Sequence, residues 1–257
     1  VTIPKVLIDI LADSTGVANE YKVIENSAQT FADNINEFSG MIGERQVGCP
    51  LVVHRRCIEP MFSISNMISY DNRMFNKTHK KEDYLKQEQP FLIKKSGWIN
   101  VEGTENGSKD HFVKNQAERV CQLLENALHI YTNLYETDDK IFIITPFRTV
   151  AESMRKFVIG YFSVKGYDKE MLTKWTKNCV GTVHTFQGKD ANEVLFVLGC
   201  SDKSVGAMNW VVKKANILNV ACTRAKYRIA FIGNLNDWKN RRYFREFIPK
   251  FIDTIDA

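Results

Sequence analysis

The chain lacks several patterns that would each have fixed its class. No stretch approaches the roughly 18 consecutive apolar residues that a membrane-spanning helix requires, and the N-terminus has no signal-peptide pattern. The six cysteines form no Cys-x-x-Cys pair and have no histidine at the spacing of a zinc site. We therefore predict no membrane partner, no metal ligands and reduced core cysteines. Reduced cysteines indicate the cytoplasm, or the nucleus in a eukaryote.

The sequence also lacks the two motifs with which an NTPase usually holds nucleotide and Mg²⁺. No Gly-x-x-x-x-Gly-Lys-Ser/Thr segment is present. In the nearest segment, Gly181 to Lys189, the glycines are too far apart, and Asp190 stands where a Mg²⁺-binding hydroxyl is needed. No apolar strand ends in an Asp-Glu pair. The chain by itself is therefore not expected to hydrolyse ATP.

What the composition does provide is enough apolar material for a full core and a mild excess of positive charge. The chain has 257 residues, of which 44% are hydrophobic and 25% are charged. The formal net charge of +5 favours a polyanionic partner, although charge alone is equally compatible with an ordinary basic globular protein.

Helical and strand patterns alternate between residues 113 and 233. Apolar residues at helical spacing follow one face of 113–134, and Ile141 to Ile144 form a continuous apolar run typical of a strand buried on both faces. The same alternation continues through the following segments: helix 150–158, strand 194–198, helix 217–221 and strand 228–233. Such alternation predicts an α/β fold with a parallel sheet covered by helices.

The remaining segments are less regular. We predict a helix over Ser27 to Met41, a strand at Leu51 to His54, and a helix that begins after Pro60. Two further predictions are an irregular connection over 160–178 and a helix over 243–255 that Pro249 interrupts. The predicted organisation is a helical segment over 1–48 and a domain over 49–257, with a polar insertion at 70–110 in which Trp98 anchors one or two strands.

Four segments resemble motifs of one protein family. TVHTFQGKDANEV resembles motif V and NVACTRAKYRIAFIGN resembles motif VI of superfamily 1 nucleic-acid helicases. LVVHRRCIEPMF resembles motif IIIa of that family, and ITPFRTVAESMRK resembles motif IV. The four segments occur in the family's order, and the branch most similar to them moves 5′ to 3′ and includes the nonsense-mediated-decay helicase.

This resemblance implies a second RecA-like domain. The family's first RecA-like domain carries the missing nucleotide motifs, so the chain is expected to be a C-terminal fragment that is inactive alone. Its implied partners are single-stranded DNA or RNA and the first RecA-like domain of the same polypeptide. ATP and Mg²⁺ are the implied cofactors, bound mainly by that first domain.

The resemblance also implies residues that face the nucleotide. Arg56 and Arg224 correspond to arginines that contact the γ-phosphate, where a planar guanidinium is more effective than a lysine ammonium. Arg55 takes the place of an aromatic residue that stacks on the base, and a guanidinium can also stack. The other implied cofactor contacts are Gln187, Gly188, Asp190 (where the family usually has Glu) and Lys226. The alternative for either arginine is a structural role, such as a surface salt bridge.

The implied nucleic-acid contacts lie on the opposite edge of the domain. Thr145 and Pro146 in motif IV, with Thr182 and His184 in motif V, correspond to positions that hold the sugar-phosphate backbone. Alternatives remain open, because Thr145 can simply cap the next helix and His184 can be a core histidine.

Two other functions compete with a motor domain. One is a standalone nucleic-acid-binding module that kept the fold without the motor. The other is a nuclease or other metal enzyme, which the sequence disfavours because its carboxylates, such as Asp9, Asp139 and Asp190, are isolated along the chain.

Overall fold

The computed structural model describes residues 32–33, 36–42, 45–48, 51–78, 91–105, 107, 110–128, 131 and 133–255. These residues fall into two compact units, which divide between Val52 and Val53. In the first unit, β1 (Gly40–Ile42) and β2 (Arg45–Val47) pair in antiparallel register. The helix predicted up to Met41 is therefore wrong at its end, and residues 27–31 and 34–35 of that helix lie outside the described residues.

The second unit is built on one five-stranded sheet in the order β5-β9-β8-β6-β7. Every pairing within this sheet is parallel. The strands are β5 (Gly97–Asn100), β6 (Ile141–Thr145), β7 (Val180–Thr182), β8 (Ala191–Val197) and β9 (Ala225–Gly233). All of β6 is buried, as a strand covered on both faces must be. The predicted α/β fold with a parallel sheet is confirmed.

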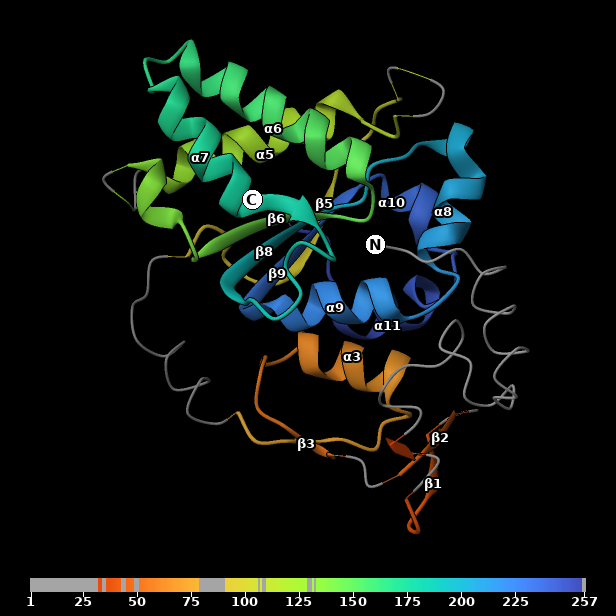
Figure 1. The fold of residues 1–257 in the computed structure, drawn as a ribbon. Helices are drawn as coiled ribbons and strands as arrows, with labels where there is room; N and C mark the ends of the chain where they lie inside the picture. The colour runs from red at the N-terminus through yellow and green to blue at the C-terminus, as the bar shows by residue number, and fades with distance from the viewer. Residues whose placement is uncertain are drawn as a thin grey trace, which may run out of the picture. The chain divides into compact units, whose positions relative to one another are not determined.

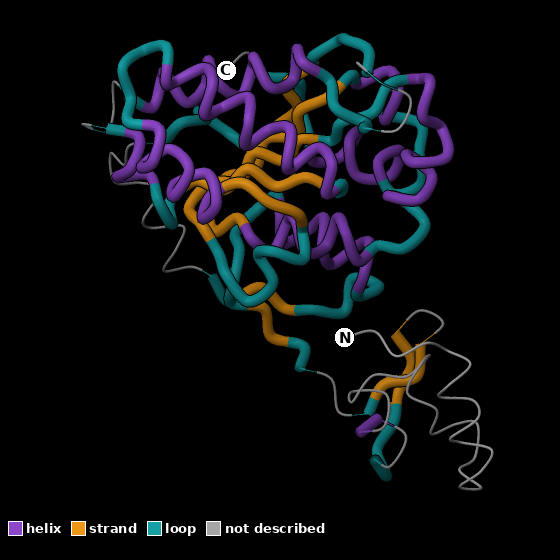
Figure 2. Tube along the Cα trace, turned by 45° about the horizontal axis from the view of Figure 1, so that its top comes forward, coloured by secondary structure: helices purple, strands orange, loops and turns teal. Residues whose placement is uncertain are grey.

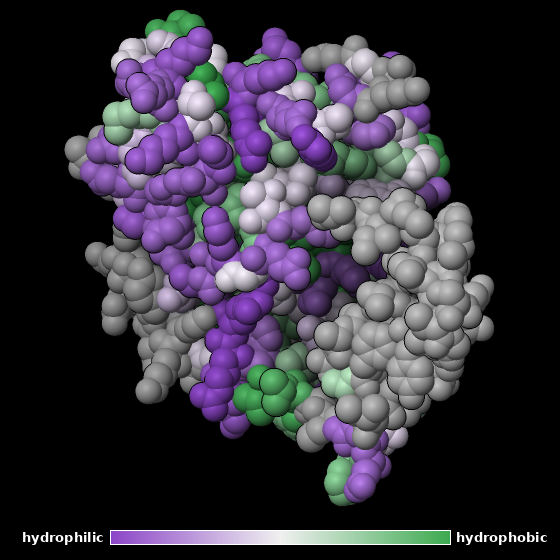
Figure 3. All heavy atoms as spheres, viewed as in Figure 1, coloured by the Kyte–Doolittle hydropathy of each residue, from purple (hydrophilic) through white to green (hydrophobic). Residues whose placement is uncertain are grey.

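Helices cover both faces of this sheet (Figures 1 and 2). One face carries α5 (Lys114–Ala127), α6 (Arg148–Ser163) and α7 (Lys169–Cys179). The other face carries α3 (Met61–Ser69), α9 (Asn216–Arg224) and α11 (Phe244–Phe251). Hydrophilic side chains gather over α6 and α7 in Figure 3, while the apolar residues of α6 recur at helical spacing and are buried toward the core.

Shorter elements complete the unit. A separate two-stranded parallel sheet joins β3 (Val53–His54) to β4 (Phe75–Asn76). The other short elements are η2 (Leu134–Thr137), η3 (Asp202–Ser204), α8 (Val205–Val211) and α10 (Leu235–Trp238). Among the described residues, no helix combines the length and the apolar character needed to cross a bilayer. The five cysteines that the structure describes are buried and unpaired by disulfides.

The segment expected to be an irregular connection over 160–178 instead contains α7. Its N-terminus is capped by Asp168, whose carboxylate accepts from the Met171 backbone N–H at 2.8 Å. The helix then buries Leu172, Trp175 and Cys179 on one face. The prediction was wrong because polar residues outnumber these widely spaced apolar ones.

The polar insertion predicted for 70–110 also needs correction at its end. Gly97–Asn100 is the edge strand β5 of the main sheet. Trp98 is fully buried there, as predicted, and its ring stacks on Phe231 with centroids 5.8 Å apart. The indole N–H donates to the Gly233 carbonyl at 2.9 Å, which satisfies its one polar group inside the core. Residues 79–90 of the insertion lie outside the described residues.

A buried carboxylate ties this segment to the middle of the sheet. Glu193, on β8, accepts hydrogen bonds from the backbone N–H groups of Leu92 at 2.7 Å and Ile93 at 2.8 Å. Arg228 stands opposite it on β9 and donates to the Ile93 carbonyl. Burial raises the pKa of Glu193 to about 7, although the two N–H donors and Arg228 act in the opposite direction. The buried carboxylate is therefore a clamp that fastens the backbone of residues 92–93 to β8.

Replacing this clamp is expected to change how stability depends on pH. The pKa of Glu193 lies above its ordinary value of 4.5, so the folded chain binds the proton more tightly than the unfolded chain does. The protonated carboxyl therefore stabilises the folded chain fully below about pH 4.5. As pH rises through about 7 this stabilisation is lost, and the free energy of unfolding falls by at most about 3 kcal/mol. Glu193→Gln should therefore flatten the fall in the free energy of unfolding over this range.

Urea unfolding of both chains from about pH 5 to 8 measures this difference. Glu118→Gln, on the half-exposed side of α5, is the matched control and should leave the profile of the unaltered chain in place. Parallel profiles for Glu193→Gln and the unaltered chain would contradict the assignment.

Candidate functional site

The predicted site residues lie at two opposite edges of the main sheet. Pro146 and Thr182 stand at the carboxyl ends of β6 and β7, whereas Asp190 and Arg224 immediately precede β8 and β9. Because the strands are parallel, the first pair shares one edge and the second pair shares the other. The loop of residues 183–190, which we call the crossing loop, runs from one edge to the other (Figure 1).

At the amino-terminal edge, the structure brings Arg55, Arg56 and Asp190 together around one hollow of about 450 Å³. The complete lining is Val53, His54, Arg55, Arg56, Tyr70, Met74, Asp190 and Thr223. The Ile58 backbone N–H donates to the Lys226 carbonyl at 3.1 Å, which attaches the segment after β3 to the start of β9. We call this the amino-edge hollow.

His54 shapes the turn that presents the two arginines. It is buried, and its Nε2 accepts from the Cys57 backbone N–H at 2.9 Å and lies 3.1 Å from the Cys57 Sγ. This contact closes the turn, so Arg55 and Arg56 lie on its exposed side. Sequence reasoning missed His54, and the signal that could have found it is the short His-Arg-Arg-Cys spacing after a strand.

Arg224 is almost fully buried, with only 4% of its surface exposed, and hydrogen bonds hold its side chain in place. Its Nη1 donates to the Lys189 carbonyl at 2.8 Å and to the Phe186 carbonyl at 3.2 Å. The Nε donates to the Val220 carbonyl, and Nη2 donates to the Thr223 hydroxyl. The guanidinium therefore joins the end of α9 to the crossing loop.

The charges at this edge are unevenly matched. Burial lowers the pKa of Arg224, Arg56 lowers it further, and Asp190 acts in the opposite direction. Asp190 is already paired with Lys226, whose Nζ lies 2.8 Å from a carboxylate oxygen. The positive charges of Arg56 and Arg224 thus act on each other at this edge, and an anion in the hollow would be attracted by both.

A second hollow adjoins the first, because Asp190 lines both. The complete lining of the second hollow is Asp138, Asp139, Phe142, Asn178, Gly188, Lys189 and Asp190. Gly188 has a φ of +88°, which suits a glycine at this turn, and Gln187 is exposed beside it. Asp139 and Asp190 share this hollow and so are less isolated than the sequence indicated. Among the described residues, however, they belong to no cluster of metal-ligating atoms.

At the carboxyl-terminal edge, three of the four predicted nucleic-acid contacts line one hollow of about 510 Å³, which we call the carboxyl-edge hollow. Its lining is Pro146, Phe147, Arg148, Ala151, Glu152, Arg155, Thr182, His184, Thr185 and Trp210. Thr145 is buried beneath it, with its hydroxyl 3.5 Å from the Phe147 backbone N–H, and His184 is exposed. The core-histidine alternative for His184 is therefore wrong. Sequence reasoning missed Phe147 and Trp210.

Local contacts fix the shape of this edge. The Thr182 backbone N–H donates to the Thr185 hydroxyl at 3.2 Å, and a Cβ at Gly181 would lie only 2.9 Å from the Thr185 side chain. The Arg155 guanidinium donates twice to the Val180 carbonyl, at 2.7 and 2.9 Å. Helix α6 thus holds the start of β7, and a local turn shapes the passage from β7 into the crossing loop.

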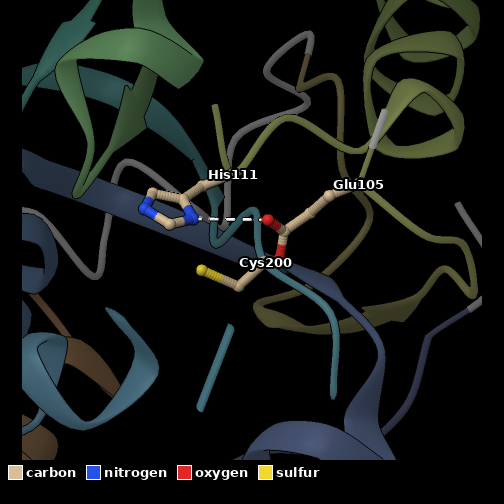
Figure 4. A group of neighbouring side chains, drawn as sticks. All are labelled: Glu105, His111 and Cys200. Carbon is tan, nitrogen blue, oxygen red and sulfur yellow. Dashed lines mark hydrogen bonds and ion pairs between the residues drawn. The ribbon is translucent and has the colours of Figure 1, made fainter. Parts of the chain in front are cut away.

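Glu105, His111 and Cys200 are the described residues whose ligand atoms come closest to forming a metal site. One such atom from each lies within 4.8 Å of the others (Figure 4). The Glu105 carboxylate already accepts from the Ser201 backbone N–H and the Ser204 hydroxyl, both at 2.8 Å, and His111 Nδ1 lies 3.3 Å away. Burial and Glu105 raise the pKa of Cys200 to about 12, so the thiol keeps its proton. Hydrogen bonds within the chain therefore account for this cluster.

Three comparisons relate the chain to known proteins. The model of a family described as the AAA domain matches residues 37–236. An uncharacterized ATP-dependent helicase of Methanocaldococcus jannaschii is 26% identical over 214 residues, which cover 77% of this chain and 28% of that protein. The C-terminal domain of a possible DNA helicase from Lactobacillus plantarum aligns at 10% identity and a TM-score of 0.37, over 70% of this chain and 87% of that domain.

The parallel sheet and its two layers of helices define an α/β domain, with two arginines at the amino-edge hollow. Because the family match covers most of the sequence, the chain belongs to the AAA-domain family. It is similar in sequence to a protein named as an ATP-dependent helicase, and it spans only 28% of that protein's length.

Removing Arg224 is expected to release the crossing loop. Arg224→Ala leaves the Phe186 and Lys189 carbonyls without their charged donor, which should lower the free energy of unfolding by about 2–3 kcal/mol. Backbone N–H groups of Thr185, Gln187 and Lys189 should then exchange with deuterium faster, since only local turn bonds hold them.

Arg245→Ala, an exposed arginine on α11, is the matched control and should change neither measurement. Arg224→Lys should be intermediate, because a single ammonium cannot reproduce the planar fork. Unchanged exchange in the crossing loop of Arg224→Ala would show that Arg224 does not hold it.

Proposed function

We propose that this chain is the second motor domain of an ATP-dependent superfamily 1 helicase of the 5′-to-3′ branch. A first RecA-like domain of the same polypeptide would bind ATP and Mg²⁺, and this domain would close on the nucleotide. Single-stranded DNA or RNA would lie along the carboxyl-terminal edge. The chain alone would then turn over no ATP.

The observation that carries this proposal is the grouping of cationic side chains at the amino-edge hollow. Arg55, Arg56 and Asp190 line it, and Arg224 lies close enough for Arg56 to lower its pKa. In phosphoryl transfer, negative charge spreads over the γ-phosphate oxygens, and a guanidinium from a second domain stabilises it. A hollow with clustered guanidinium groups is suited to that task.

The two arginines would divide the work. Arg56 is exposed at the rim, so it would contact the γ-phosphate directly. Arg224 is buried, and its Nη1 already donates to carbonyls of the crossing loop. It would therefore act on the phosphate mainly through its positive charge, and through Nη2, which among the described residues donates only to the Thr223 hydroxyl. Anion binding would draw on both, because it reduces their mutual repulsion.

Other residues at this edge would contact the rest of the nucleotide. Arg55 and Tyr70 line the amino-edge hollow, and either offers a flat group for stacking on a base. Asp190 and Lys226, which pair with each other, would lie near the ribose and the phosphates. Gly188 and Gln187, in the exposed part of the crossing loop, would approach the nucleotide from the adjoining side.

Nucleic acid would be held at the other edge. Pro146, Thr182 and His184 line the carboxyl-edge hollow, and Arg148 adds positive charge to the lining. Hydroxyl and imidazole groups can contact phosphates without reading sequence, which suits a motor that must move along any strand. Thr145 would support this surface from beneath, since its side chain is buried.

Arg56→Ala in the full-length protein tests this proposal. ATP hydrolysis should fall by roughly 10³-fold or more, because the γ-phosphate loses its guanidinium, while binding of a single strand stays within about twofold of the unaltered protein. Arg56→Lys should rescue little, since it keeps the charge but loses the bidentate geometry. Turnover and oligonucleotide anisotropy are measured on the same preparations.

Arg245→Ala, on the outer surface of α11, again serves as the matched control. The motor assignment would fail if Arg56→Ala hydrolysed ATP normally. It would also fail if this substitution removed strand binding while leaving turnover intact.

A standalone nucleic-acid-binding module is the second candidate, and the hydroxyl-lined carboxyl-edge hollow is the observation that favours it. It predicts salt-dependent binding of single strands by this chain alone. Adding the first RecA-like domain and ATP distinguishes the two, because only a motor domain should then change its strand affinity.

A further inference from the structure

Trp210 differs from the other tryptophans of the chain. Of the four, Trp98, Trp175 and Trp238 are buried, whereas Trp210 is 50% exposed. It lies in α8, between the segments that resemble motifs V and VI, and no predicted function includes it. What distinguishes Trp210 is its place in the lining of the carboxyl-edge hollow, beside the proposed nucleic-acid contacts.

The indole lies at the boundary of two hollows. It lines the carboxyl-edge hollow together with Thr182 and His184, and it also lines a neighbouring hollow of about 550 Å³. The complete lining of the neighbouring hollow is Gly206, Asn209, Trp210, Val212, Lys213 and Arg242. The two hollows share Trp210 as a lining residue, so an extended ligand in one would reach the other by passing the indole.

The ring is fixed in place from within the domain. Trp210 packs on Phe147 with ring centroids 5.7 Å apart, and Phe147 in turn packs on His111 at 4.8 Å. Phe147 and His111 are themselves largely buried, so this row of rings leads from the core to the surface. A ring held in this way loses little conformational entropy when a flat ligand stacks on it.

The charges on either side of the indole favour an anionic, extended ligand. Lys213 and Arg242 are exposed in the neighbouring hollow, and Arg148 is exposed in the carboxyl-edge hollow, where it pairs with Glu152. Spaced cations around a flat aromatic surface are the elements with which proteins hold single strands, because cations track phosphates and every base has a π-face.

We infer that Trp210 is a base-stacking platform for single-stranded nucleic acid. The strand would run from Thr182 and His184 over the indole toward Lys213 and Arg242. This inference rests on the proposed function, since it adds a base contact to the backbone contacts proposed above. Stacking on Trp210 would let the domain bind strands of any base sequence, but it would require that the strand carry bases.

Intrinsic fluorescence gives a direct test, because only one of the four tryptophans is exposed. An oligothymidylate should quench the emission of this chain and protect it from acrylamide. An oligonucleotide of the same length whose sugars carry no bases should bind more weakly and give neither effect. Both are titrated under identical salt conditions.

Variants separate stacking from folding. Trp210→Ala should weaken oligothymidylate binding about 10-fold and leave the salt dependence unchanged, since no phosphate contact is lost. Trp210→Phe keeps a ring and should stay within about threefold of the unaltered chain. Val205→Ala is the matched control, because Val205 is 49% exposed on the same helix but lines neither hollow. Thermal melting verifies that all four chains fold alike.

Two unfavourable results have different meanings. If the unaltered chain binds the oligonucleotide, but Trp210 stays accessible and Trp210→Ala binds equally well, the stacking inference is overturned and the proposed function stands. If the unaltered chain binds no oligonucleotide, both the nucleic-acid surface and the stacking platform are overturned. Equal binding of the two oligonucleotides would also overturn stacking.

Discussion

Both candidate sites depend on the hydrogen bonds between Arg224 and the crossing loop. Its guanidinium donates to the carbonyls of Phe186 and Lys189, and the Phe186 ring stacks on Phe142 of β6 with centroids 4.3 Å apart. Otherwise the described backbone bonds within this loop are local turns. The loop begins with residues that line the carboxyl-edge hollow and ends with Asp190 at the amino-edge hollow. Arg224 thus helps to hold the loop that contributes residues to both hollows.

This arrangement offers a physical route between the two edges under the proposed function. An anion in the amino-edge hollow would attract the same guanidinium that the loop carbonyls now hold. Coupling requires that the anion and the nucleic acid favour different arrangements of one element. The crossing loop can be that element, because its eight residues reach both hollows. The anion would replace loop carbonyls as the hydrogen-bond acceptors of Arg224. Each hydrogen bond to a charged group contributes about 1.5–3 kcal/mol, which is in the range of typical allosteric coupling energies.

The sequence predicted the parts of the fold that continuous apolar runs or helical periodicity define. Strand β6 and helices α3, α6 and α9 follow from such patterns. Arg55, Arg56 and Asp190, which the resemblance assigned to one site, line one hollow. The sequence could not reveal the clamp made by Glu193, because its partners lie about a hundred residues away. For the same reason it did not show that Arg224 is buried or that Trp210 is exposed. Burial depends on tertiary packing, which residue type alone does not specify.

The two edges differ in a way that suits their proposed ligands. At the amino edge, the guanidinium of Arg224 is buried, and Asp190, whose carboxylate favours its charged form, is paired with Lys226. Such a charge is costly unless it is compensated, so the carbonyls of the crossing loop serve as its partners. At the carboxyl edge, hydroxyls, an exposed imidazole and aromatic rings are combined with Arg148, Glu152 and Arg155. Under the proposed function, a strand would slide over the carboxyl-terminal edge, and the amino-terminal edge would hold a compact anion.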